Sequence, residues 1–359
     1  MPVNIARLVE GMYQIKASDM HLKVGLPPHM RVNSQIQQVK HPVLTDEDME
    51  DLVKEIIPPR LHEDFRKNGA VDFAYTLPDE SGRCRTAAFH QRNHISMTFR
   101  RISMTIPTAA ELNLPEVVET FIQITRGLFL VTGITGSGKS TTLAGLVGAV
   151  NRTRRGHIIT IEDPIEYLFP SDGLCLINQM EVGVDTPGFG HAMRHILRCD
   201  PDIILIGEMR DRETVETAIQ AVDTGHMVFS TLHTSDAKQT VNRILNFFQS
   251  TEEKMILELL SNNLHALVSQ RLVPRCDVKG VIPACEILVN TPIVTKLIFE
   301  GRIADLQQVM KNGDKGMQSF DMALAALVKA GKISLDTALA ESSDPSSLQR
   351  LIKGVSSAG

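Results

Sequence analysis

A short glycine-rich stretch contains the residues with the clearest chemical meaning. Gly133, Gly138, Lys139 and Ser140 follow the spacing G-x-x-x-x-G-K-S, between an apolar run and a helical pattern. Backbone N–H groups of such a loop wrap a phosphate chain, and the lysine neutralises the β and γ oxygens. The serine hydroxyl suits Mg²⁺. The stretch therefore predicts a P-loop, with these nucleotide-binding residues: Thr135, Gly136, Ser137, Gly138, Lys139, Ser140 and Thr141.

Polar side chains follow three further apolar runs, HIITIED, DIILIGEMRD and MVFSTLH. In an open α/β sheet, ligands bind beyond the carboxyl ends of the strands, so parallel strands would bring these side chains near the P-loop. Glu208 comes directly after Gly207 and best fits a metal-supporting carboxylate. Either Glu162 or Glu208 could polarise the attacking water while the other supports the metal. His233 is a candidate sensor of the γ-phosphate.

Arginines are the third set of candidates. Phosphoryl transfer gains from an arginine that meets the charge developing on the γ-phosphate, and a neighbouring subunit often supplies it. Arg85 and Arg100 lie on predicted strands of the N-terminal part, while Arg194 and Arg198 are four residues apart on one predicted helix face.

The order of helical and strand patterns along the sequence predicts an α/β protein with more than one domain. Residues 1–105 contain a helical pattern, short alternating strands and a second helix after Thr45, which indicates a small α+β domain. Residues 106–116, with two prolines, indicate a linker. Over 117–270, near-continuous apolar strands alternate with helices, as in a sheet covered on both faces. The chain is expected to be mostly helical from about residue 252, with a helical C-terminal region at 271–359.

Composition excludes some function classes and weakens others. The 359 residues have a formal net charge of −5, only 4% are aromatic and tryptophan is absent, which argues against nucleic acid as a ligand. The sequence has no signal-type start and no apolar run long enough to span a bilayer. A cytoplasmic protein without membrane insertion is therefore expected.

Four motifs in order resemble those of a known family. GITGSGKSTT, ITIEDPIEY, LRCDPDIILIGEMRDRET and TGHMVFSTLHT are similar to the Walker A, Asp-box, Walker B and His-box motifs of type IV pilus retraction ATPases, the PilT/PilU type of the secretion ATPase superfamily. ASDMHLKVGLPPHMRVN and NTPIVTKLIFEG extend the likeness towards both ends.

The resemblance implies a PAS-like N-terminal domain, a RecA-like core and a homo-hexameric ring with ATP and Mg²⁺ between subunits. By this likeness the chain would drive pilus retraction and twitching motility from the cytoplasmic face of the inner membrane, against a membrane platform protein. The linker would act as a hinge. Carried over by position, Glu162 is the Asp-box catalytic glutamate and Glu208 the Walker B glutamate. The other residues so implied are the His-box pair His226 and His233 and the arginines Arg85, Arg100, Arg194 and Arg210.

Departures from the family pattern leave alternatives open. Retraction ATPases often carry an A-I-R-x-L-I-R-E helix, whereas residues 293–300 read IVTKLIFE, with Thr295 and Phe299 at the arginine positions. QMEVG also replaces the family's Q-R-E-V-G, through Met180. An accessory, PilU-like ring subunit that depends on a paralogous retraction ATPase is therefore an alternative. A pilus-assembly or type II secretion ATPase is a more distant one.

Overall fold

The computed structural model describes residues 3–33 and 35–354, and the chain divides into two compact units. The first unit reaches Thr105 and includes Glu166–Leu168, and the second consists of Ile106–Ile165 and the residues from Phe169 onward. Each unit has its own sheet and its own apolar core. In the residues described, no helix combines the length and apolar character needed to cross a membrane.

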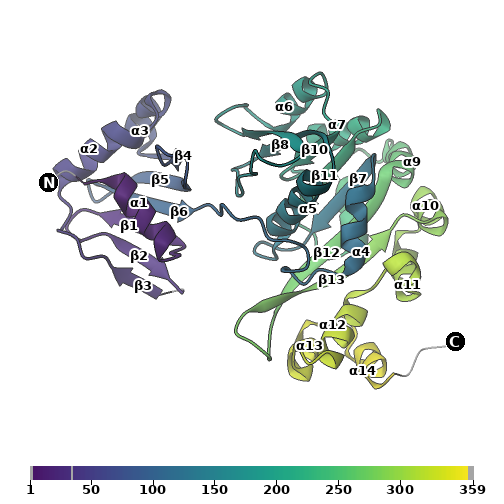
Figure 1. The fold of residues 1–359 in the computed structure, drawn as a ribbon. Helices are drawn as coiled ribbons and strands as arrows, with labels where there is room; N and C mark the ends of the chain where they lie inside the picture. Colours follow the sequence, from purple (N-terminus) through teal and green to yellow (C-terminus); the bar gives the residue numbers. More distant parts are fainter. Residues whose placement is uncertain (1–2, 34, 355–359) are drawn as a thin grey trace. The chain divides into compact units, whose positions relative to one another are not determined.

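The first unit is an antiparallel sheet with three α-helices (Figure 1). The sequence predicted its strands and two of its helices, whereas α3 was not predicted. The strand order is β3-β2-β1-β6-β5-β4. Thr45 caps its helix through a reciprocal capping box with Asp48, which satisfies two N–H groups of the first turn. The elements are α1 (Ile5–Gln14), β1 (Asp19–Lys23), β2 (His29–Val32), β3 (Gln35–Gln38), α2 (Asp46–Ile56), α3 (His62–Asn68), β4 (Ala70–Thr76), β5 (Arg83–Gln91) and β6 (His94–Arg101).

The second unit is built on a seven-stranded sheet of order β13-β12-β7-β11-β10-β8-β9. Its strands are β7 (Gly127–Thr132), β8 (Gly156–Glu162), β9 (Cys175–Glu181), β10 (Ile203–Ile206), β11 (Met227–Leu232), β12 (Leu264–Pro274) and β13 (Val281–Val289). Its helices are α4 (Glu116–Thr120), α5 (Lys139–Thr153), α6 (Phe189–Ile196), α7 (Arg212–Asp223), α8 (Ala237–Leu245), α9 (Glu253–Asn263), α10 (Pro292–Phe299), α11 (Leu306–Lys311), α12 (Phe320–Lys329), α13 (Leu335–Glu341) and α14 (Pro345–Lys353).

Helices cover both faces of this second sheet, which explains the continuous apolar strands. Successive side chains of β7 point to opposite faces. Leu128 and Leu130 pack in one cluster with residues of α6 to α11, whereas Phe129 and Val131 pack in another with residues of α4 and α5. β7, β11, β10 and β8 pair in parallel, so the predicted parallel sheet is confirmed.

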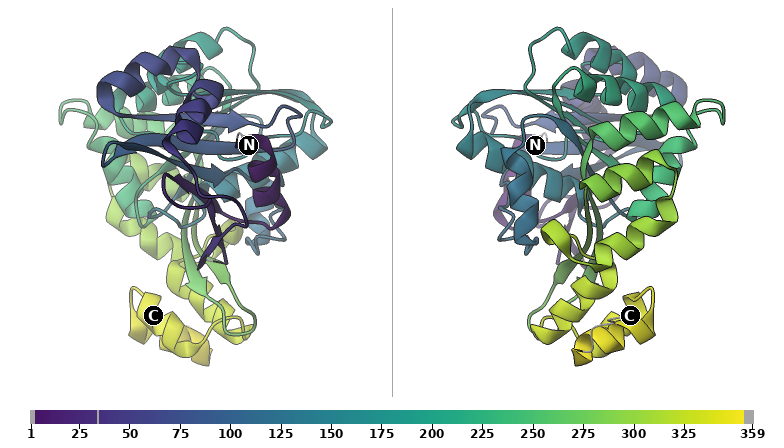
Figure 2. Two further views of the ribbon diagram at one scale, coloured as in Figure 1. Left: turned by 90° about the vertical axis from the view of Figure 1, so that its left-hand side faces the viewer. Right: turned by 90° about the vertical axis from the view of Figure 1, so that its right-hand side faces the viewer.

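The region after residue 252 differs in part from the expected helices. β12 and β13 form a long antiparallel hairpin, and only α9 and the elements from α10 onward are helical. LHALVSQRLVP and VIPACEILV are apolar runs whose periodicity does not separate a buried strand from a buried helix. Figure 2 shows the yellow C-terminal helices beside this hairpin, and a shared apolar cluster joins them to its outer part. β9 was likewise not predicted.

The linker segment lies against α5 through two helix positions without side chains. A Cβ on Gly145 would lie 3.0 Å from the Pro107 carbonyl oxygen, and one on Gly148 would lie 2.8 Å from Cγ2 of Ile106. Both distances are shorter than van der Waals contact, so glycine at these positions lets the segment approach the helix backbone. The start of the predicted linker thus packs on the second unit.

Candidate active site

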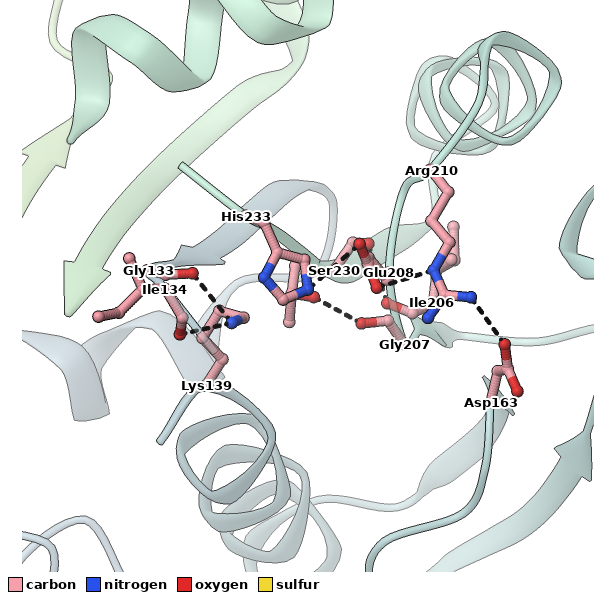
Figure 3. Close-up of polar contacts among 11 residues, drawn as sticks. Gly133, Ile134, Lys139, Asp163, Ile206, Gly207, Glu208, Arg210, Ser230 and His233 are labelled. Carbon is pink, nitrogen blue, oxygen red and sulfur yellow. Dashed lines mark hydrogen bonds and ion pairs between the residues drawn. The ribbon is translucent and has the colours of Figure 1, made fainter. Parts of the chain in front are cut away.

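The P-loop lies at the carboxyl end of β7, between the neighbouring strands β11 and β12. Gly138, in the left-handed region with φ 87°, precedes the first residue of α5. Lys139 is only 8% exposed, and its Nζ donates hydrogen bonds to the carbonyl oxygens of Gly133 (2.9 Å) and Ile134 (3.1 Å) (Figure 3). An ammonium group is thus held within a glycine loop at a helix N-terminus, which is an arrangement that binds phosphate.

The ends of β10 and β11 bring a carboxylate, an imidazole and a guanidinium together beside this loop (Figure 3). The Glu208 carboxylate lies 3.3 Å from Nε2 of His233 and accepts a 2.9 Å hydrogen bond from Nε of Arg210. Arg210 also donates to Asp163 over 2.8 Å. Hydrogen bonding to Glu208 raises the pKa of Arg210, so this guanidinium stays charged. Arg210 therefore links the end of β10 to the residue after β8.

Glu162 ends β8, the strand next to β10, and its carboxylate is oriented by two donors. The Thr160 hydroxyl donates to Oε1 over 2.7 Å, and the Gln179 amide donates to the same oxygen over 3.1 Å. Gly207 allows the close approach of the two strand ends, because a Cβ there would lie 3.3 Å from the Cα of Glu162. Both candidate glutamates are therefore fixed at the carboxyl edge of one sheet.

The oxygen donors at this edge are of the kind that Mg²⁺ takes in proteins. In the described part of the chain, no group of three or more histidine, cysteine or acidic residues is placed to hold a metal. Mg²⁺ is usually bound through one or two carboxylates together with substrate phosphates and water. The sequence predicts two oxygen ligands for Mg²⁺, namely the hydroxyl of Ser140 and the carboxylate of Glu208.

In the first unit, Arg85 and Arg100 occupy opposed positions on β5 and β6, so both lie on one face of the sheet. Asp19 is opposite Arg100 on one side and Arg31 on the other. Its carboxylate lies 3.0 Å from Nε of Arg100 and 3.7 Å from Nε of Arg31. Burial raises the pKa of Asp19, but the Arg100 and Ser18 hydrogen bonds outweigh it and leave the pKa below its ordinary value. Sequence reasoning missed Asp19 and Arg31, because only strand register reveals this row.

Comparison with known proteins identifies the family. The model of the family described as "Type II/IV secretion system protein" matches residues 5–318. The chain belongs to this family. Among curated members it is 40% identical to the type IV pilus ATPase PilU of Pseudomonas aeruginosa, over 97% of this chain and 91% of the relative. It is 42% identical to the PilT retraction ATPase of the same organism, over 90% of this chain and 93% of that relative.

A solved structure of this secretion ATPase family extends the likeness to the fold. The crystal structure of the pilus retraction motor PilT with bound ADP matches with a TM-score of 0.90 and 39% identity, over 97% of this chain and 99% of that chain. The resemblance to pilus ATPases of the PilT/PilU type is thus confirmed, as is the mixed α/β architecture.

Two residues that the family motifs suggested do not join the cluster at the P-loop. His226 precedes β11, whereas His233 follows its carboxyl end. A strand of this length separates the two histidines by roughly 20 Å, so His226 lies at the end of β11 opposite to His233 and the P-loop. Its Nδ1 lies 2.8 Å from the Ala221 carbonyl oxygen. Arg194 of α6 instead pairs with Glu213 of α7.

A buried carboxylate lies near the loop that carries His233. Glu286 of β13 accepts a 2.9 Å hydrogen bond from the backbone N–H of Ala237, the first residue of α8. Burial raises the pKa of Glu286 to about 7. The N–H of Ala237 and the charge of Arg271 lower it, whereas Asp236 and Asp321 raise it.

We expect Glu286→Gln to reduce the pH dependence of stability. The native carboxyl retains its proton up to about pH 7, whereas the unfolded one loses it near 4.5. The native state therefore binds more protons in that window, and the free energy of unfolding falls as pH rises through it, by up to about 3 kcal/mol. Glutamine still accepts from Ala237 but has no charge. Thermal unfolding at pH 5 and pH 8 should show a smaller drop in Tm for the variant; equal drops would contradict the assignment.

Proposed function

We propose that this chain is an ATPase that couples ATP hydrolysis to the retraction of type IV pili. The observation that carries the proposal is the convergence of Glu208, His233 and Arg210 beside a P-loop whose lysine is held within the loop. A phosphate cradle beside fixed carboxylates is suited to phosphoryl transfer to water. The names of the relatives, a pilus retraction ATPase and a motor with bound ADP, supply the biological process.

Each residue of the site has a defined part in the proposed reaction. The loop from Thr135 to Thr141 binds the phosphates, and Lys139 places its charge at the β and γ oxygens. Glu162, fixed by Thr160 and Gln179, accepts a proton from the attacking water. His233, whose Nε2 lies 3.3 Å from the Glu208 carboxylate, reports the presence of the γ-phosphate.

Mg²⁺ would be held by Ser140 and Glu208 together with the substrate phosphates. When bound, it neutralises charge on the β and γ oxygens. Arg210 keeps the Glu208 carboxylate fixed from the other side, since it binds both Glu208 and Asp163.

The proposed assembly is a homo-hexamer in which a neighbouring subunit completes the site. Arg85 and Arg100 project from one sheet face of a PAS-like domain at 1–105 and would act on nucleotide in the adjacent copy. Arg194 and His226 would likewise act only between copies. The RecA-like core at 117–270 and the C-terminal region at 271–359 follow the hinge at 106–116. A pilus platform protein at the cytoplasmic face of the inner membrane is the proposed partner.

An accessory role beside a paralogous retraction ATPase is the second candidate function. The observation that favours it is α10, where Thr295 and Phe299 stand at the positions of the family's arginines. Phe299 is 48% exposed, so an apolar surface replaces a cation there. The identity to PilU, 40%, is also close to that to PilT, 42%.

Steady-state ATP hydrolysis by the purified chain over a range of protein concentrations tests the proposal. Turnover per subunit is expected to rise as rings form, because the arginines come from another copy. Lys139→Ala, which removes the buried cation from the loop, should lower turnover by roughly 10²-fold or more. A ring that binds ATP but has no turnover would favour the accessory role. If the Lys139→Ala variant had the same turnover as the unaltered chain, the proposed site would be wrong.

A further inference from the structure

Gln270 of β12 is a buried polar side chain that touches the P-loop and has no part in the mechanism above. It is 3% exposed. Its Nε2 donates a 2.8 Å hydrogen bond to the carbonyl oxygen of Ser137, inside the loop. Its Oε1 accepts a 2.8 Å hydrogen bond from the hydroxyl of Thr142, in the first turn of α5. One amide therefore joins the phosphate loop to the helix that follows it.

The bond to Ser137 fixes the direction of a whole peptide unit. In a planar trans peptide, the carbonyl of Ser137 and the N–H of Gly138 point in opposite directions. A carbonyl held towards β12 therefore turns the Gly138 N–H away from β12. Gly138 has φ 87°, and glycine accepts either sign of φ, so nothing in its own chemistry prevents this peptide from flipping.

The P-loop also packs closely against β12 at Gln270. A Cβ on Gly133 would lie 2.5 Å from the carbonyl oxygen of Gln270, and one on Gly138 would lie 2.8 Å from its Nε2. Real Cβ atoms do not approach so closely. Both glycines of the P-loop motif thus leave room for Gln270.

We infer that Gln270 is a positioning residue of the nucleotide site, which holds the Ser137–Gly138 peptide with its N–H directed at the phosphates. The inference rests on the proposed function, because it assigns a role within the same site. A flipped peptide would present a carbonyl oxygen to a polyanion, and the site would lose one donor and gain one repulsive contact. Nucleotide affinity should therefore depend on Gln270, although the side chain itself need not touch nucleotide.

The test compares nucleotide affinity with turnover in matched variants. Gln270→Met keeps the length and approximate volume of the side chain but removes both hydrogen bonds. Titration with a fluorescent ADP analogue should show Kd raised about tenfold or more, as expected for one lost hydrogen bond to a charged group. At saturating ATP, turnover should change by less than about threefold, because Glu162 and Glu208 are untouched.

Two further variants separate this role from general loosening of β12. Ser269→Ala removes the adjacent buried hydroxyl, which accepts a 2.9 Å hydrogen bond from Thr132 and does not bind Ser137; its Kd should stay within twofold. Thr142→Val removes only the anchor of the amide oxygen and should have a smaller effect than Gln270→Met. Circular dichroism at the assay temperature would establish that all variants are folded.

The outcomes are distinct. A raised Kd for Gln270→Met with an unchanged Kd for Ser269→Ala would support the inference. Equal affinities of the unaltered chain and Gln270→Met, or equal losses in the two variants, would overturn it and leave the proposed function intact. Absence of nucleotide binding by the unaltered chain would overturn both.

Discussion

Glu162→Gln is expected to lower ATP turnover by about 10² to 10⁴-fold while leaving ATP affinity unchanged. Glutamine has nearly the same shape and can still accept a hydrogen bond from Thr160. It cannot accept a proton from water, so the variant removes the base and retains the geometry. Turnover and equilibrium ATP binding, measured on the same preparation, would check both parts of this expectation.

A matched control is available four residues further along the chain. Glu166 is an exposed carboxylate, and Glu166→Gln changes the net charge by the same amount. Its turnover should equal that of the unaltered chain. Full turnover of Glu162→Gln would remove Glu162 from the role of general base and leave Glu208 as the candidate.

Glu208→Ala is expected to reduce turnover by roughly 10³-fold and to raise the Mg²⁺ concentration needed for half-maximal activity. The Glu208 carboxylate contacts both His233 and Arg210, so its removal takes one contact from each of them and also leaves the proposed metal site without its carboxylate. Turnover measured across a Mg²⁺ titration, with chelator as the zero point, distinguishes this loss from that of Glu162→Gln.

Asp211→Asn provides the control for the second glutamate. Asp211 is the N-cap of α7, where its side chain accepts from the backbone N–H of Thr214, and asparagine is an equally good cap. The control should have unchanged turnover and Mg²⁺ dependence. If the Mg²⁺ concentration for half-maximal activity were unchanged in Glu208→Ala but raised in Glu162→Gln, the proposed roles of the two glutamates would be exchanged.

The sequence alone predicted those residues of the candidate site whose motif also indicates the local strand, loop or helix. Gly138 and Lys139 belong to a motif whose spacing matches a strand, a loop and a helix. Glu208 and His233 end apolar strands, and a parallel sheet necessarily places such ends at one edge. These predictions needed no knowledge of which strands are neighbours.

The parts that the sequence did not predict depend on pairing between distant segments. Gln270 is informative only because β12 lies beside β7, and no local motif states that. Asp19 becomes the partner of both Arg31 and Arg100 through the register of three strands. His226 was placed with His233 because both belong to one motif, although a strand separates them. Motifs group residues along the chain, whereas the site requires groups at one strand end.

The position of β7 between β11 and β12 sets an order for the folding of the newly made chain. Gly127 pairs with Met227, and Leu128 pairs with Leu264, so both neighbours of β7 are synthesised much later than β7 itself. The first unit combines local hairpins, such as Gln91 opposite His94, with the pairing of β1 and β6, and all of its strands precede β7 in the chain, so it can form while translation continues. Nucleotide stabilises only a completed binding loop. It can therefore assist this fold only after the ribosome has passed β12.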